Sequence, residues 1–184
     1  YTYNPPIPSS GPVSLGGFQK RTLGSGTYRF DSVSLKGFSS VTFGTSSSDV
    51  IDVYVDGDLK VTGLAAMKVY DGAKVTIHHG SGLLEFKGIS VVNASGERKP
   101  EDFIIKSATN YRINFTGITA YFGVIYAPSA EIRILGIAGM WGAAIGNRIR
   151  LLGIGGIHYD EDLINMNWGG GSAGYEARSW REIP

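Results

Sequence analysis

The stretch Ile113-Asn114-Phe115-Thr116-Gly117-Ile118-Thr119-Ala120-Tyr121 decides the fold of this chain. Its first four residues alternate apolar and polar side chains, which is the period-two pattern of a half-buried β-strand. The glycine that follows reaches the backbone angles of a sharp corner, and small residues let neighbouring backbones approach. We interpret the stretch as a strand, a corner and the start of a second strand.

This pattern occurs six times along the chain. The corner glycines are Gly37, Gly63, Gly88, Gly117, Gly136 and Gly153, at intervals of 26, 25, 29, 19 and 17 residues. Repeats of this length are typical of a solenoid in which each coil contains two or three short strands. Each coil buries its inner face by stacking on its neighbours, about 4.8 Å away. A β-sandwich also has many short strands, but it has no reason to repeat one corner six times. The sequence therefore predicts an all-β, parallel β-solenoid (β-helix) of about six or seven coils.

The rest of the chain divides around this repeat. Residues 1–22 are rich in Pro and Ser and predict an extended N-terminal arm. Residues 23–159 form the predicted solenoid, with a polar insertion at 93–102 that explains the longest interval. Residues 160–184 contain a glycine hinge and are predicted to be a C-terminal cap over the end of the solenoid.

Composition excludes several classes of function. There are 17 Lys and Arg against 16 Asp and Glu, for a formal charge of +1, and no basic run that would indicate nucleic-acid binding. Zero cysteines exclude disulfides, thiolate metal sites and a cysteine nucleophile. No apolar run is long enough to span a membrane. Because the chain begins with Tyr1 instead of Met, we expect an extracellular or cell-surface protein from which an N-terminal segment has been removed.

The residue after each corner glycine is a large apolar one. These residues are Phe38, Leu64, Ile89, Ile118, Ile137 and Ile154. If the coils are in register they form an apolar ladder, which faces either the core or a second subunit, because a long exposed apolar stripe is otherwise a liability. The arm residues Tyr1, Tyr3 and Ile7 are predicted to lie along a neighbouring subunit, the alternative being a disordered terminus.

No set of residues predicts catalysis, a metal or a cofactor. The Asp-Gly-Asp run at residues 56–58 is typical of a turn in which Asp bonds its own backbone. His78 and His79 are adjacent and point to opposite faces of a strand, so they do not suit one metal ion. Asn93 and Asn114 begin sequons for glycosylation. Outward aromatic residues such as Tyr54 and Trp141 could stack on sugars.

Several segments resemble an uncharacterised bacterial β-solenoid surface domain found in type IV pilus assembly and minor-pilin-like proteins. The resemblance rests on the runs Phe122-Gly123-Val124-Ile125-Tyr126-Ala127-Pro128, Gly142-Ala143-Ala144-Ile145-Gly146 and His158-Tyr159-Asp160-Glu161, and it extends from about Leu23 to Trp180. It implies a right-handed solenoid on the cell surface or in an appendage.

Repeat, ladder and resemblance together predict a structural role. We expect a non-enzymatic subunit of an extracellular filament or pilus-like assembly, a homopolymer held by coil stacking, the apolar ladder and the arm. Two alternatives stay open: a monomeric cell-surface adhesin that binds glycans, and a polysaccharide-active β-helix enzyme, although no convergent set of acids and bases supports the enzyme.

Overall fold

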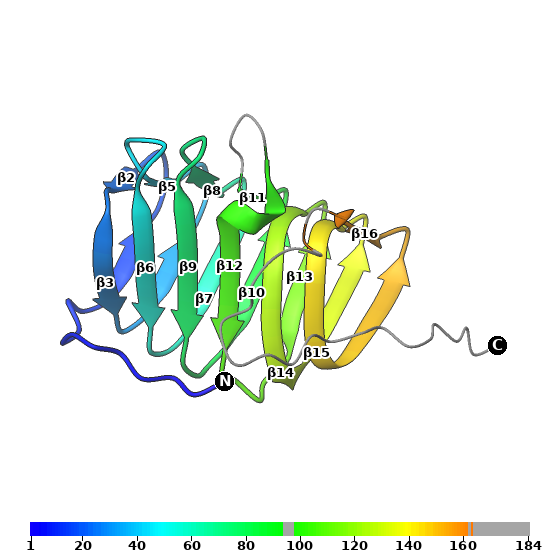
Figure 1. The fold of residues 1–184 in the computed structure, drawn as a ribbon. Coiled ribbons are helices and arrows are strands. Elements are labelled where there is room, and N and C mark those ends of the chain that lie inside the picture. Colours follow the sequence, from blue (N-terminus) through cyan, green and yellow to red (C-terminus); the bar gives the residue numbers. More distant parts are fainter. Residues whose placement is uncertain (94–97, 162, 164–184) are drawn as a thin grey trace.

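The chain winds into a stack of coils built from parallel strands (Figure 1). The computed structural model describes residues 1–93, 98–161 and 163. Each coil passes through three columns of strands, and every strand pairs with the equivalent strand of the next coil. The predicted β-solenoid is therefore confirmed.

The columns follow the order of the strands in each coil. The first column contains β1 (Val13–Leu15), β4 (Val33–Leu35), β7 (Leu59–Gly63), β10 (Leu84–Gly88), β13 (Ile113–Gly117) and the ends of β14 (Ala120–Gly136) and β15 (Gly139–Gly153). The second contains β2 (Lys20–Leu23), β5 (Ser40–Phe43), β8 (Ala66–Val69), β11 (Val91–Val92), the starts of β14 and β15, and β16 (Gly156–Tyr159). The third contains β3 (Gly26–Phe30), β6 (Val50–Val55), β9 (Lys74–His79), β12 (Phe103–Ser107) and the middle of β14 and β15. A short 3-10 helix, η1 (Pro100–Asp102), precedes β12.

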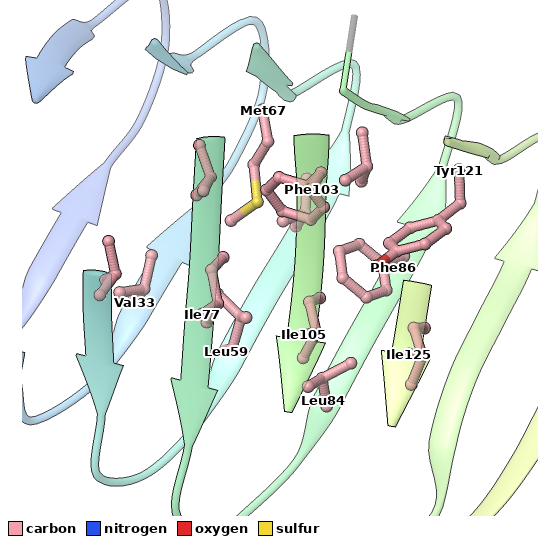
Figure 2. Packing of buried hydrophobic residues seen from close by; sticks show 14 of the residues in the cluster. Val33, Leu59, Met67, Ile77, Leu84, Phe86, Phe103, Ile105, Tyr121 and Ile125 are labelled. Carbon is pink, nitrogen blue, oxygen red and sulfur yellow. The ribbon is translucent and has the colours of Figure 1, made fainter. Parts of the chain in front are cut away.

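Inward-facing side chains of the three columns form one continuous core (Figure 2). Alternation along each strand places one apolar row inside, and the parallel register stacks like residues on like. Phe86 stacks on Phe115 with ring centroids 4.9 Å apart, and Tyr121 meets both rings edge-on. The Tyr121 hydroxyl donates a hydrogen bond to the Val124 carbonyl, which satisfies the polar atom of a fully buried ring.

The solenoid begins earlier than the sequence pattern indicated. Strand β1 and the first three residues of β2 lie within residues 1–22, the predicted arm, and Val13 of β1 pairs with Val33 of β4. The segment 13–18 follows the same alternation and ends on Gly17 and an apolar residue. Gly16 replaces the polar residue that precedes most corner glycines, and the nearby prolines hide the pattern. The extended arm is therefore shorter, and a coil precedes the six recognised in the sequence.

The arm folds back on its own solenoid and passes the C-terminal ends of β3, β6 and β9 (Figure 1). The Tyr3 hydroxyl donates to the Asp56 carboxylate, and the Tyr1 hydroxyl lies 2.9 Å from Nδ1 of His78. Arg29 donates to the Ile7 carbonyl at 2.9 Å. The contacts of Tyr1, Tyr3 and Ile7 in this structure are thus intramolecular, and their predicted engagement of a neighbouring subunit stays a prediction.

The predicted cap lies mostly outside the described residues, which end at 161 and 163. Within the described part of the chain, no helix has the length and apolar character needed to cross a membrane.

Candidate functional site

The corners between the first and second columns stack in register along the whole solenoid. Each corner has a glycine at positive φ, and after the first corner the next residue donates its N–H to the glycine carbonyl of the preceding coil. This bond is 2.8 Å from Phe38 to Gly17 and 2.9 Å from Ile154 to Gly136. The residues after the glycines form what we call the corner ladder: Phe18, Phe38, Leu64, Ile89, Ile118, Ile137 and Ile154.

The corner ladder faces outward. Its side chains are between 43% and 87% exposed, with Leu64 at the lower limit and Ile154 at the upper. The small residue that follows points the other way, and Ser39, Ala65 and Ala138 are buried. The corner backbone therefore turns the small residue into the core and leaves the large apolar one outside. Of the two orientations that the sequence left open, the structure has the outward one.

The glycines are required at these corners for two reasons. Gly117 has a φ of +100°, and a Cβ built on it would lie 2.6 Å from the carbonyl oxygen of Gly88 in the preceding coil. Gly88 has the same relation to Gly63, with a φ of +96° and a distance of 2.6 Å. A side chain would be strained by its backbone angle and would also separate the coils.

Phe18 is a member of the ladder that the sequence analysis missed, because the first coil was assigned to the arm. Its ring stacks on Phe38 with centroids 5.1 Å apart and planes 12° from parallel. Phe18 is 78% exposed even so. The signal that could have found it is the Gly17–Phe18 pair, which repeats the glycine and apolar residue of every later corner.

The apolar surface widens toward the last coils. Beside the early corners the outward residues of the first column are polar, as at Lys36 and Lys87. Beside the late corners they are Leu135 and Leu152, and Leu152 is 54% exposed. At the end of the stack, β15 also exposes Ile145, Ile149 and Leu151, because the register of β16 covers only the first part of β15 among the described residues.

A second outward feature is an aromatic column on the second column of strands. Phe122, Trp141 and His158 occupy equivalent positions in three successive coils. Trp141 stacks on Phe122 with centroids 4.7 Å apart and on His158 with centroids 5.1 Å apart. The guanidinium of Arg98 lies 5.0 Å from the centre of the Phe122 ring. Tyr54, which the sequence also indicated as an outward aromatic, instead stacks on His78 under the arm.

Two acidic residues, Asp49 and Asp58, hold turns and neighbouring coils. Asp49 accepts the backbone N–H groups of Thr45 and Ser46, which lowers the pKa of its carboxyl. Asp58 accepts hydrogen bonds from Lys60 and from the Leu83 backbone, and these bonds lower its pKa. Carboxylates with such partners are structural.

Asp56 lies under the arm. It forms a two-point ion pair with Arg29, through contacts of 3.0 and 3.1 Å, and this pair lowers the pKa of the Asp56 carboxyl. The Tyr3 hydroxyl is its second partner. The carboxylate therefore joins β6 to β3 and holds the arm against both strands.

The two adjacent histidines point to opposite faces, as predicted. His78 is on the outer face, where its Nε2 lies 3.1 Å from Asp52. His79 is fully buried, and its Nδ1 lies 2.8 Å from the Ser107 hydroxyl. Burial lowers the pKa of His79 to about 4, so its ring is neutral at pH 7. Within the described residues no three His, Asp or Glu side chains are grouped so as to hold a metal ion.

The two sequons differ in accessibility. Asn114 occupies an outward position of β13 and is half-buried. Asn93 is completely buried, and its side-chain amide donates to the Lys99 carbonyl at 2.9 Å. A glycan needs an accessible amide nitrogen. Asn114 is therefore the more accessible of the two, and glycosylation of both asparagines stays a prediction.

Fold and corner ladder define the chain as a parallel β-solenoid with an exposed apolar edge. The chain belongs to the family described as a domain of unknown function (DUF7305), whose match covers residues 10–166. No curated protein matches the chain, and no solved structure matches it.

Proposed function

We propose that the chain is a structural subunit of an extracellular filament or pilus-like surface assembly, in which copies associate through the corner ladder. The observation that carries the proposal is the ladder itself: seven large apolar side chains in register on the outside of the molecule. Stripes of this kind mark interaction surfaces, because water disfavours them. The pilus-like setting is taken from the sequence resemblance.

A second copy is the partner that the geometry of the ladder favours. Its steps repeat at the coil spacing of about 4.8 Å. Two antiparallel ladders therefore match along their whole length, which is the self-complementary contact of a two-fold interface. A partner without this repeat would match only a few of the steps.

The end of the stack offers a second contact. Strand β15 presents apolar side chains at Ile145, Ile149 and Leu151, all at least 40% exposed. Among the described residues, the later part of β15 has no strand beyond it, and a strand in that position presents backbone groups that a neighbouring coil can satisfy. Side-to-side ladder contacts and end-to-end stacking together produce a polymer instead of a closed dimer.

The free energy of burying the ladder is large enough for a filament of many copies but gives only weak association of two copies. Burying a whole Leu, Ile or Phe side chain is worth about 2 kcal/mol, so half-exposed members contribute about 1 kcal/mol each. Seven members on each of two copies give about 14 kcal/mol, against an association cost of about 4 to 15 kcal/mol. A single pair is weak on this estimate, and a filament gains stability from repetition.

Sedimentation velocity over a concentration series, followed by negative-stain electron microscopy, tests the proposal on the purified chain. Association that rises with concentration and ends in regular fibres supports it. A monomer at every concentration, with no fibres, overturns it.

The aromatic column favours a second candidate function, a surface adhesin. Phe122 and Trp141 stack face to face and therefore present their ring edges to solvent as an apolar strip, against which a sugar ring can pack. A monomer that binds neutral glycans, and loses this binding when Trp141 is replaced by Ala, would support the adhesin over the filament subunit.

A further inference from the structure

Four arginines gather on the outer face of the first column in the last three coils. Arg133 and Arg150 are paired in register on β14 and β15, and Arg148 is paired in the same way with Glu131. Arg112 precedes β13 and lies beside Glu131. We call Arg112, Arg133, Arg148 and Arg150 the arginine cluster. They come from three different coils, so no continuous basic run in the sequence indicates them.

Glu131 lies at the centre of the cluster. Its carboxylate is 2.8 Å from Nε of Arg133 and 2.9 Å from Nε of Arg150, and Nε of Arg112 is 3.5 Å away. These contacts lower the pKa of Glu131, with the hydrogen bond from Arg133 as the main cause. The carboxylate therefore remains charged and fixes the arginine side chains in place.

One carboxylate does not neutralise this cluster. Four guanidinium groups and one carboxylate leave a net charge of +3 on a small area of the sheet. Each guanidinium carries five N–H donors, whereas a carboxylate has about four acceptor positions. Arg148 has no hydrogen-bond or ion-pair partner among the described residues, and Arg112 and Arg150 have side chains 60% and 45% exposed. Most of these donors therefore face solvent.

The surroundings favour an extended carboxylate ligand. Asn114 is paired in register with Arg133 and adds an amide that can bond sugar hydroxyls. Arginine forks suit planar carboxylates, which they bind at two points. Glu85 follows Asn114 in the same outward row and is paired with Lys87 at 2.7 Å, so the excess positive charge does not continue onto that coil. The excess is confined to the last three coils, a small area that suits a single polymer strand better than a broad anionic membrane.

We propose that the arginine cluster, with Asn114, binds the carboxylate groups of an acidic polysaccharide. The site is separate from the corner ladder and does not depend on self-association. A filament subunit and a monomer could both use it.

The test is titration calorimetry of the full chain with polygalacturonate. Fully methyl-esterified polygalacturonate is the matched control, because it keeps the sugar backbone and lacks the charge. We expect binding to the acid and none to the ester. Equal binding to both, or binding to neither, would overturn the proposal. Equally tight binding to single-stranded DNA or to phosphatidylserine vesicles would show a general anion surface and overturn it as well.

Variants locate the site. Arg133→Gln with Arg150→Gln should weaken binding by about tenfold or more, since each loses a charge-assisted hydrogen bond. Lys36→Gln with Lys68→Gln changes the net charge by the same amount in earlier coils and should leave binding within about twofold, as expected for screened charges away from the ligand. An equal loss in both pairs contradicts the assignment.

A single substitution protects the test against misfolding. Arg148→Gln leaves the ion pairs of Glu131 intact, so its thermal midpoint should match the parent protein while binding falls. If Arg148→Gln folds and binds as well as the parent protein, Arg148 is no part of the site and the four-arginine assignment fails.

Discussion

Replacing Ile118, Ile137 and Ile154 together with Asn tests whether the corner ladder drives association. All three lie in the last coils, where the apolar surface is widest. Their exposed fractions are 54%, 59% and 87%, which together equal about two whole isoleucine side chains. The change therefore removes outward apolar surface and leaves the core untouched.

The expected effect on association is large. At about 2 kcal/mol for a fully buried isoleucine, the three substitutions remove about 4 kcal/mol from the contact surface of each copy. Every 1.4 kcal/mol changes an equilibrium constant about tenfold, so the dissociation constant should rise by about a thousandfold or more. The free energy of unfolding should change little, since exposed substitutions are usually within about 0.5 kcal/mol each.

The assay compares sedimentation velocity and fibre formation with thermal unfolding of the same samples. Val50, Tyr70 and Tyr111 provide the matched control, because they are 57%, 47% and 56% exposed and lie away from the ladder. Replacing these three with Asn should leave association unchanged. If the ladder variant still forms fibres, or if the control variant loses them equally, the reasoning from the ladder is refuted.

Three further predictions concern the fold. Gly117→Ala should lower the free energy of unfolding by about 3 kcal/mol, because left-handed strain adds to a close backbone contact. Urea denaturation measures this loss. Gly24→Ala is the control, because a Cβ there meets open space, and an equal loss in both variants would contradict the prediction. Burial lowers the pKa of His79 from 6.5 to about 4, so between these pH values the unfolded chain binds a proton on this ring and the folded chain does not. The free energy of unfolding should therefore fall by about 3 kcal/mol as the pH drops from 6.5 toward 4. His79→Gln should flatten this dependence in thermal unfolding, and an unchanged slope would count against the role of His79. Tyr3→Phe should cost about 1 kcal/mol by removing the bond to Asp56, and an unchanged thermal midpoint would show that the arm adds no stability.

The repeated corner was enough to predict the fold, because each copy carries both the strand period and the glycine that ends it. The orientation of the ladder could not be derived in the same way. Ile118 and the small residue Thr119 both suit a core, and only the backbone angles at Gly117 determine which one turns inward. The first coil was lost because prolines and a second glycine obscure its pattern.

The arginine cluster follows from the same repeat, although no basic run marks it. Arg112, Glu131 and Arg148 each lie five residues before a corner glycine, so the alignment of the corners places them side by side. What the repeat could not provide is the set of side-chain contacts that decides how much of the charge is neutralised. Composition alone gave a charge near zero and concealed a local excess of +3.

The connections between the columns differ in how much their number of residues varies from coil to coil. From β7 onward the corner that carries the ladder keeps two residues between strands, as at 64–65, 89–90 and 137–138, while the shorter strands of the first two coils leave four. The connection from the second to the third column grows from residues 24–25 in the first coil to residues 93–102 in the fourth, and β14 passes the same point without a break. One edge of the molecule is therefore held constant while another accepts insertions. A foreign peptide grafted at that second edge would be displayed without disturbing the first, so the solenoid can diversify one flank and preserve the other.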